Sequence, residues 1–355
     1  MQIERLPTNP LFTPADIKPS RPDVEIMCAF NPGATLYGGK RLLLLRVAEM
    51  ATPDKGCVAT PIFDPETGEV HIQQFRKDDP DLELPDPRFF KHKGKIYLTS
   101  LSHLRIATSD DGLNFTIDDQ PSIFPVGHYE AFGIEDARIT EIEGTYYINY
   151  TAASDFGVVT SLITTTDFKN FKRKGIIFGP DNKDVALFPE KINGRYQAFH
   201  RPAVVHTGKP SIWTASSTDM LDWGRHEYII GPRSGHWDCE RVGAGSAPIK
   251  TPEGWLAFYH AADYDTRYCL GILLLDLDKP SKVLARSEKP FFIPETSYEC
   301  EGGFMPNVVF HNGTIVPGDG SVELYYGGGD LVTCGARVQL SDLLNHLKIS
   351  GENEI

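Results

Sequence analysis

The sequence lacks the marks of a membrane protein or a secreted one. No apolar run approaches the roughly 20 residues that cross a bilayer, and the opening stretch MQIERLPTNPLFTPADIKPS has no apolar core of a signal peptide. Cysteine is scarce, and the six cysteines are scattered without a C-x-x-C pair, which argues against a zinc site or a redox motif. We therefore expect a cytoplasmic protein with reduced thiols, no metal, no organic cofactor and no membrane partner.

Positive charge is also in short supply. Lys and Arg number 35 against 48 Asp and Glu, which gives a formal net charge of −13. A nucleic acid or an anionic membrane would require a basic footprint on the protein, so neither is an expected partner. A site for an inorganic anion such as phosphate would have to gather its basic residues locally.

Helical patterns are nearly absent. Only LSDLLNHLKI (340–349) reads as a helix, whereas strand-like runs rich in β-branched and aromatic residues recur along the chain. Hydrophobic residues make up 41% of the chain and aromatic residues 11%, which is enough for a large packed core. The sequence therefore predicts an all-β fold with a short C-terminal helix over residues 340–350.

An internal repeat narrows the fold further. Three strands that end in Ser or Thr are followed by an Asp and, four residues later, an aromatic residue: Asp111 with Phe115, Asp167 with Phe171, and Asp219 with Trp223. The Asp residues are 56 and 52 positions apart, and a fourth unit, GWLAFYH to LLLDLDKP, keeps the strand pair but is expected to lack the turn. Repeats of roughly 50 residues, each a small antiparallel sheet, are typical of a β-propeller.

Chain length sets the number of blades. At about 70 residues per blade the 355 residues give five blades, and six short blades stay open as an alternative. No linker or low-complexity stretch divides the chain. We predict a single five-bladed β-propeller over residues 1–355, with residues 1–20 as an N-terminal arm that packs elsewhere or contacts another subunit of a homo-oligomer.

Polar residues at strand ends are the candidate site residues, because the inner strands of a propeller converge on one end of a central channel. The candidates are Arg46, Asp86, Arg88, Glu135, Asp136, Arg138, Asp184, Lys191, His200, Arg201, Glu240, Arg241, His260 and Asp330. Charged residues beside apolar strands are costly to bury unless they are paired or functional. Pairs such as Asp86 with Arg88 could instead lock adjacent turns, but the whole set indicates a shared site.

This mixture of carboxylates and bases suits the cleavage of glycosidic bonds. One carboxylic acid must protonate the leaving oxygen while a nucleophile attacks the opposite face of the sugar. An inverting hydrolase uses a second carboxylate to activate water, whereas inverting phosphorolysis needs basic residues that hold a phosphate dianion. The available bases, Arg201, Arg241, His260 and Lys191, favour inorganic phosphate as the co-substrate.

Several longer stretches carry a family resemblance that covers nearly the whole chain. They are AFNPGA (29–34), LLLLRVAE (42–49), EDARIT (135–140), the segment 165–196 with DNKDVALFPEKING, HRP (200–202), RVGAG with GWLAFYH (241–260), and NVVFHNG (307–313). In these stretches the sequence resembles glycoside hydrolase family 130, and specifically its β-1,2-mannoside phosphorylases. The resemblance implies a five-bladed propeller that releases α-mannose 1-phosphate from mannobiose or oligomannan.

The resemblance also implies roles for individual residues. Asp136, in the E-D-x-R motif, would be the general acid, with its proton reaching the glycosidic oxygen through a mannose hydroxyl. Phosphate would be bound by Arg201, Arg241 and His260, with Lys191 as a further candidate. The mannose at the cleaved bond would be bound by Arg46, Asp86, Asp184 and Asp330. From their place beside these motifs we also expect Arg88 and Arg138 to bind the substrate, and His236 and Tyr264, in neighbouring loops, to contact the departing sugar.

Two departures from the family pattern are small, and a third matters more. Ala137 replaces a usual Pro and Ala261 a usual Gly, which leaves the functional groups intact. Glu240 stands beside Arg241, and if it entered the pocket it would serve as the base of an inverting β-1,2-mannosidase. Two further alternatives stay open: a furanosidase using Asp86 and Glu301, and a non-catalytic sugar-binding propeller.

Overall fold

Strands dominate the computed structural model, which describes residues 3–204, 206–301 and 303–351. The predicted all-β class is confirmed. The predicted C-terminal helix is α2, Leu340–Gly351, and the other helical elements are single turns: η1 Pro14–Asp16, η2 His128–Glu130 and α1 Ser297–Cys300. No helix in the described ranges is both long and apolar enough to span a bilayer.

Twenty strands form five groups of four antiparallel strands, which we number sheets 1 to 5. Sheet 1 contains β2 Val24–Tyr37, β3 Lys40–Ala51, β9 Ser100–Ser109 and β10 Thr116–Ile117. Sheet 2 contains β11 Gly133–Ile142, β12 Thr145–Ser154, β13 Gly157–Thr165 and β14 Lys172–Phe178. Sheet 3 contains β15 Asn182–Leu187, β16 Tyr196–Pro202, β17 Ile212–Ser217 and β18 Trp223–Ile230. A single parallel bridge between Gly133 and Ser102 joins sheets 1 and 2 into one continuous sheet.

The last two sheets complete the set. Sheet 4 contains β19 Arg241–Ala244, β21 Gly254–Ala262, β22 Tyr268–Leu275 and β23 Val283–Arg286, with the short β20 Ile249–Thr251 also paired to β21. Sheet 5 contains β24 Val309–Ile315, β25 Ser321–Gly328, β26 Val332–Gln339 and, from the other end of the chain, β1 Glu4–Arg5. The predicted arm thus packs on sheet 5 of its own chain, although its residues 1 and 2 lie outside the described ranges.

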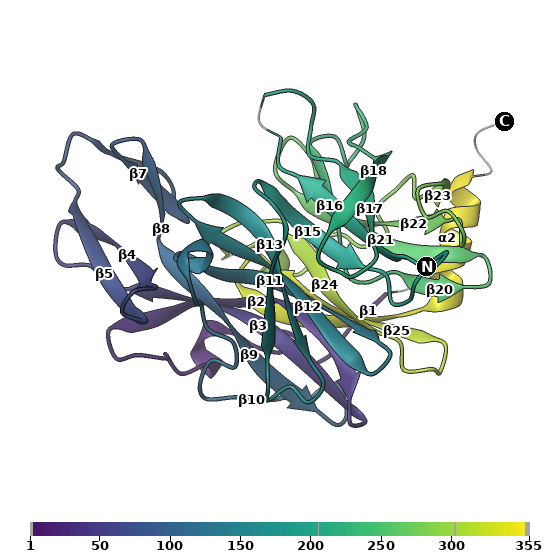
Figure 1. Cartoon of the computed structure of the whole chain (residues 1–355), viewed down its shortest axis with the longest axis horizontal. Helices are drawn as coiled ribbons and strands as arrows, with labels where there is room; N and C mark the ends of the chain where they lie inside the picture. The colour runs from purple at the N-terminus through teal and green to yellow at the C-terminus, as the bar shows by residue number, and fades with distance from the viewer. Residues whose placement is uncertain (1–2, 205, 302, 352–355) are drawn as a thin grey trace.

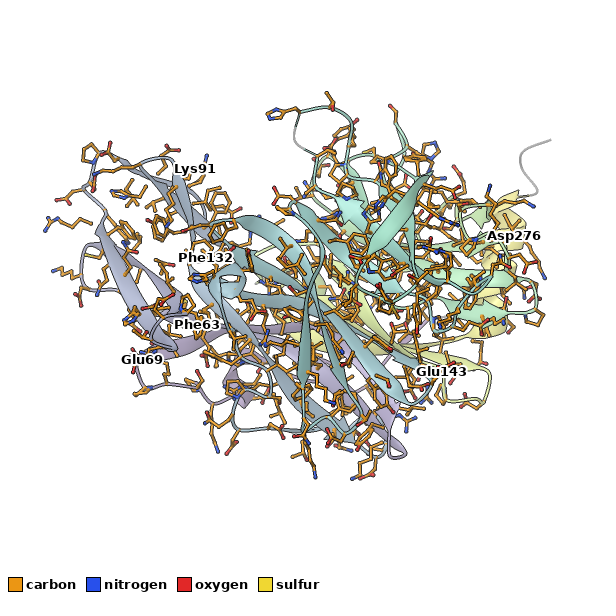
Figure 2. The ribbon with its side chains drawn as sticks, viewed as in Figure 1. Phe63, Glu69, Lys91, Phe132, Glu143 and Asp276 are labelled. Carbon is orange, nitrogen blue, oxygen red and sulfur yellow. The ribbon has the colours of Figure 1, made fainter. Side chains whose placement is uncertain are left out.

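An insertion between β3 and β9 stands apart from these sheets. It consists of β4 Cys57–Asp64, β5 Glu69–Arg76, β6 Leu82–Asp86, β7 Phe89–His92 and β8 Lys95–Leu98. Figure 1 shows it projecting at the upper left, on the side of the molecule away from α2. In Figure 2, Glu69 and Lys91 lie on this projection, while Asp276 lies at the opposite end. Phe132 packs with aromatic residues of the insertion and so anchors it to sheet 2.

The repeat seen in the sequence is a turn between the third and fourth strands of a sheet. Asp111, Asp167 and Asp219 each accept two backbone N–H bonds with one carboxylate oxygen, at 2.8–2.9 Å. The expectation that the fourth unit lacks this turn is wrong. Asp276 caps the backbone of Asp278 and Lys279 in the same way, at 3.0 Å, because the Asp alone makes the turn. Only the neighbouring Ser or Thr and the aromatic residue are missing from sheet 4.

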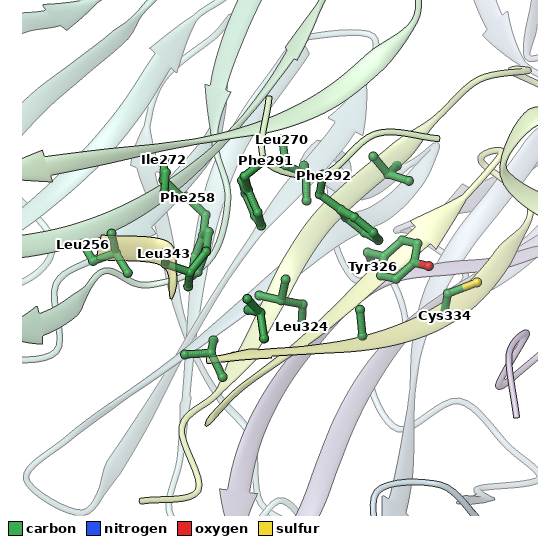
Figure 3. Close-up of a cluster of buried hydrophobic side chains, with 14 of the residues drawn as sticks. Leu256, Phe258, Leu270, Ile272, Phe291, Phe292, Leu324, Tyr326, Cys334 and Leu343 are labelled. Carbon is green, nitrogen blue, oxygen red and sulfur yellow. The ribbon is translucent and has the colours of Figure 1, made fainter. Parts of the chain in front are cut away.

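Apolar clusters fill the spaces between adjacent sheets. In Figure 3, Phe258 and Ile272 of sheet 4 meet Leu324 and Tyr326 of sheet 5, and Leu343 of α2 closes the end. Each fully buried side chain of this size stabilises the fold by about 1.5–3 kcal/mol. The core therefore lies between the sheets, and polar side chains gather where the first strands of the sheets face one another.

Candidate active site

The first strands of three sheets share one irregularity. A β-bulge interrupts the pairing of β2, β11 and β15, and each bulge contains a residue with positive φ: Asn31 (46°), Asp136 (51°) and Asp184 (54°). Asn and Asp tolerate this left-handed conformation better than other side chains except Gly. A bulge re-aims the side chain it carries. Three sheets therefore direct a short polar side chain toward one central region.

A pocket of about 320 Å³ occupies this region. Its charged lining residues are Arg46, Arg88, Glu135, Asp136, Lys183, Asp184, Arg201, Arg241 and Asp330, and its uncharged ones include Phe30, Asn31, Phe89, Tyr268, Phe304 and Phe310. Eight of the residues predicted for the site thus line one cavity, although they are separated by up to 284 positions in the chain. The lining combines charged and aromatic side chains, which suits a sugar bound together with an anion.

Asp136 is held by one of its two carboxylate oxygens. Oδ1 accepts hydrogen bonds from Asn31 Nδ2 and Arg46 Nη1, both at 3.0 Å, while no described residue bonds to Oδ2. Arg46 also donates to Glu135 at 2.8 Å. Burial alone would raise the pKa of Asp136, but Arg46 and Lys183 outweigh it and hold that pKa below the usual range. Asp136 is therefore ionised in the free protein and has one oxygen available.

Asp184 lies in the equivalent bulge, but both of its carboxylate oxygens are already paired with Arg or His side chains. Its Oδ2 lies 2.8 Å from Arg201 Nη1 and 3.1 Å from His260 Nε2, and its Oδ1 lies 3.4 Å from Arg138 Nη2. Burial opposes ionisation, but Arg201, His260 and Arg138 hold the pKa of Asp184 well below its ordinary value. Gly243 on β19 leaves the room for this arrangement, because a Cβ there would overlap both Asp184 and His260.

Two cations in the pocket have no partner of their own. Among the described residues, the side chains of Lys183 and Arg241 form no hydrogen bond or ion pair, whereas Arg46, Arg88 and Arg201 are each paired with a carboxylate. A positive charge without a counter-ion in a partly desolvated pocket attracts an anionic ligand. Lys183 precedes Asp184 directly, so the ammonium and the paired carboxylate come from the same bulge.

Asp330 follows β25 and is the pocket carboxylate with no donor. In the described part of the chain it accepts no hydrogen bond and forms no ion pair, and its φ of 51° is again left-handed. Burial, and then the nearby charge of Asp136, raise the pKa of Asp330 to about 6. Near neutral pH this group is thus far easier to protonate than Asp136.

Three predicted site residues lie just outside the pocket surface. Arg88 donates hydrogen bonds of 2.9 and 2.8 Å to Asp86, and Arg88 rather than Asp86 lines the cavity. Arg138 is buried beneath the pocket and donates to the carbonyl oxygens of Gly245 and Ala244. His260 is fully buried behind Asp184. These residues support the lining rather than forming it.

Four others lie away from the pocket lining. Lys191 is exposed, with its ammonium 4.6 Å from the centre of the Tyr196 ring. Glu240 is paired with Lys209 at 2.6 Å, and the same ammonium lies over the exposed ring of Tyr264. His236 is paired with Glu288 at 3.2 Å. A charged side chain near a motif in the sequence therefore need not face the site, because its direction depends on strand and turn geometry.

The sequence did not lead us to predict Lys183, Asn31 or the aromatic lining residues, Phe30, Phe89, Tyr268, Phe304 and Phe310. A signal for Lys183 was present, because the pair Lys183–Asp184 falls at the same place in its strand as Glu135–Asp136 does in β11. On the neighbouring strand, Arg201 lies directly opposite Lys183. For metal binding, the described residues contain no group of three or more His, Cys, Asp or Glu side chains placed to hold an ion.

Comparison with known proteins gives a consistent result. The profile of glycoside hydrolase family 130, described as beta-1,4-mannooligosaccharide phosphorylase, matches residues 88–349. A beta-1,2-mannobiose phosphorylase of Listeria innocua is 45% identical over 99% of this chain and 100% of its own length. A 1,2-beta-oligomannan phosphorylase of Thermoanaerobacter is 42% identical over 68% of this chain and 80% of its own.

Solved structures agree with the sequence relatives. The Listeria innocua beta-1,2-mannobiose phosphorylase, determined in complex with beta-1,2-mannobiose, superposes with a TM-score of 0.95 at 45% identity. The match covers 98% of this chain and 100% of that one. The same relative therefore matches this chain in sequence and in fold over its full length.

Proposed function

The chain belongs to glycoside hydrolase family 130, and from this membership we propose that it cleaves β-1,2-linked mannosides by inverting phosphorolysis. The products are α-mannose 1-phosphate and the shortened sugar. One observation carries the proposal: the pocket combines a carboxylate with a free oxygen, Asp136, and two cations without counter-ions, Lys183 and Arg241. The β-1,2 linkage is supported by relatives at 45% and 42% identity, against 32% for a β-1,4-mannooligosaccharide phosphorylase.

The fold that we propose for this activity is a single five-bladed propeller. Its support is the count of five four-stranded sheets, together with the pairing of β1 from the N-terminal end with β26 from the C-terminal end. In such a ring the first strands of the sheets face the centre. Asn31, Asp136 and Asp184 occupy equivalent bulges of first strands, in accord with this arrangement.

Phosphate binds in this proposal at Lys183, Arg201 and Arg241. A dianion gains the strongest attraction from cations that have no other partner, which ranks Lys183 and Arg241 above Arg201. Asp184 and His260 then act behind the lining, because they fix the guanidinium of Arg201. Lys191, exposed on Tyr196, has no part in this site.

Asp136 is the general acid of the proposed reaction. As the C1–O bond of the mannoside breaks, a phosphate oxygen forms a bond to C1 from the opposite face, which inverts the configuration. The proton of Asp136 passes through a hydroxyl of the bound mannose to the leaving oxygen. Arg46 holds Asp136 in place, and Arg88, Asp330 and the aromatic side chains of the pocket bind the sugar.

The surroundings of Glu240 favour phosphorolysis over hydrolysis. A hydrolase needs a second carboxylate that is free to activate water on the face of the sugar opposite the acid. Glu240 is absent from the pocket lining and is held by Lys209. The cytoplasm is the compartment we propose, since all six cysteines are free thiols.

The test is product analysis with purified protein. β-1,2-mannobiose and β-1,4-mannobiose are each incubated with and without inorganic phosphate. We expect mannose 1-phosphate from β-1,2-mannobiose only when phosphate is present. Free mannose released without phosphate would identify a hydrolase. Reaction of β-1,4-mannobiose but not of β-1,2-mannobiose would refute the proposed linkage.

A further inference from the structure

If the protein has the function proposed above, Asp136 must obtain a proton before it can act as the general acid. Asp136 must carry a proton when the glycosidic bond breaks, yet Arg46 and Asn31 both donate to its Oδ1, a pattern that stabilises the ionised form. An ionised Asp136 cannot donate. The proton must therefore come to Asp136 from elsewhere, after the ligands have entered.

Asp330 is the pocket group that is built to hold this proton. It lines the same cavity as Asp136, but among the described residues it has no hydrogen-bond donor and no ion pair. Asp330 is half-buried, and a carboxyl in a partly desolvated pocket that accepts no hydrogen bond from the protein favours its neutral form more than one held by two donors. Asp136 has two donors and Asp330 has none, so a single proton in the pocket belongs on Asp330.

The charged groups around Asp330 come from four elements. Asp136 on β11 opposes its ionisation, whereas Arg46 on β3, Arg88 beside β7 and Lys183 on β15 favour it, and burial is the largest effect. Cys28 on β2 also faces it, but burial raises the pKa of that thiol to about 12, so the thiol stays neutral. The balance of these groups leaves the pKa of Asp330 at about 6.

Lys183 links the two carboxyls to phosphate. Among the cations it is second only to Arg46 in its effect on Asp136, but it is the weakest of the three that act on Asp330. Its side chain has no counter-ion in the described part of the protein, so a phosphate dianion in the pocket would pair with it. Pairing cancels the positive charge of Lys183 at both carboxyls, and Asp136, which depends on Arg46 and Lys183 to offset its burial, then becomes easier to protonate.

We propose that Asp136 and Asp330 share one proton, that this proton rests on Asp330 in the free protein, and that phosphate binding at Lys183 transfers it to Asp136. Asp136 then gives it, through the mannose hydroxyl, to the glycosidic oxygen as the C1–O bond breaks. The attacking HPO₄²⁻ becomes part of a protonated mannose 1-phosphate monoanion. That monoanion returns its proton to the carboxyl pair as it leaves as the dianion, so no proton is consumed per turnover.

Infrared spectroscopy of the protein without sugar tests the resting position of the proton. A protonated carboxyl gives a carbonyl stretching band that a carboxylate lacks. We expect this band in the wild type at pH 5, with a titration midpoint near pH 6, and its loss in Asp330→Asn. In Asp136→Asn the band persists, with a lower midpoint because a repelling charge is gone. A band that survives in Asp330→Asn but disappears in Asp136→Asn would overturn the proposal.

Adding inorganic phosphate tests the transfer. We expect the band at pH 5 to change frequency when phosphate is added, against a chloride control of equal ionic strength. The change should be absent in Lys183→Met and intact in Lys191→Met, the matched control on the surface. A phosphate response that is the same in Lys183→Met as in the wild type would refute the role of Lys183.

The pH dependence of turnover gives a second readout. For phosphorolysis of β-1,2-mannobiose, kcat/KM should fall above about pH 6 in the wild type, and this limb should move to more acid pH in Asp330→Asn. A residue that only binds sugar would raise KM and leave the limb in place, which would contradict the proposal. If the wild type releases no mannose 1-phosphate, the proposed function fails, while the infrared bands still decide where the proton rests.

Discussion

Two bulges with the same backbone geometry hold carboxylates that behave in opposite ways. Asp136 in sheet 2 and Asp184 in sheet 3 are both buried and both have φ near 50°. Asp136 keeps one oxygen free, whereas both oxygens of Asp184 are engaged by cations. The difference arises from the next sheet along the chain, because Gly243 leaves the space that Asp184 and His260 fill. The bulge thus supplies the direction of a side chain, and the number of cations in reach decides whether it reacts.

The strongest test of this comparison is Asp136→Asn. Asn tolerates the left-handed backbone and preserves the shape of the side chain, so the change removes the carboxyl's proton and its negative charge but little of the packing. We expect kcat for phosphorolysis to fall by about 10³-fold. The free energy of unfolding should change by less than about 1 kcal/mol, because Glu135 remains as a partner for Arg46. Equal turnover in the variant and the wild type would remove Asp136 from the chemistry.

The same substitution in the other bulge, Asp184→Asn, should act on stability. It leaves the buried guanidinium groups of Arg138 and Arg201 without a full counter-charge, which costs about 3–5 kcal/mol. Urea unfolding at pH 7 measures this loss. Where the variant still folds, KM for phosphate should rise more than KM for mannobiose. If Asp184→Asn were as stable as Asp136→Asn, the contrast between the two bulges would be lost.

Two lysines of one segment sharpen the comparison at the phosphate site. Lys183 lines the pocket without a counter-ion, and Lys191 lies exposed on Tyr196. We expect Lys183→Met to raise KM for phosphate by about 10- to 100-fold, the worth of one charge-assisted hydrogen bond. Lys191→Met is the matched control and should leave KM unchanged. Initial rates over a phosphate series distinguish the two, and a larger effect at Lys191 would relocate the site.

The smallest expected effect concerns stability and pH at Asp330. Its pKa of about 6 lies above the ordinary 3.8, so the folded protein binds more protons than the unfolded chain between these pH values. The free energy of unfolding of the wild type therefore falls as pH rises through that window, and the loss that Asp330 causes stays constant at higher pH. Asp330→Asn cannot ionise, so it should be more stable than the wild type at pH 8, by at most the roughly 3 kcal/mol that corresponds to a shift from 3.8 to about 6. Below pH 4 the difference should vanish, and a gain that is independent of pH would contradict this explanation.

More of the fold than of the site could be predicted from the sequence. Turns such as that at Asp167 recur in the letters of the sequence because one Asp side chain makes the turn by itself. The direction of a charged side chain depends instead on strand register and on distant partners. The sequence analysis chose Lys191 and not Lys183, because the signal for Lys183 lies in its equivalence to Glu135 of another sheet and not in the residues around it. Glu240 likewise depends on Lys209, which is 31 positions away.

The pairing of residues 4 and 5 with β26 has a consequence for how the protein is made. Sheet 5 needs strands from both ends of the chain, and Asp330 enters the pocket only with the segment between its last two strands. Until β26 has been synthesised, β1 has no partner strand and its edge stays uncovered. Synthesis of residues 309–339 is therefore the step that both completes sheet 5 and brings Asp330 to the pocket.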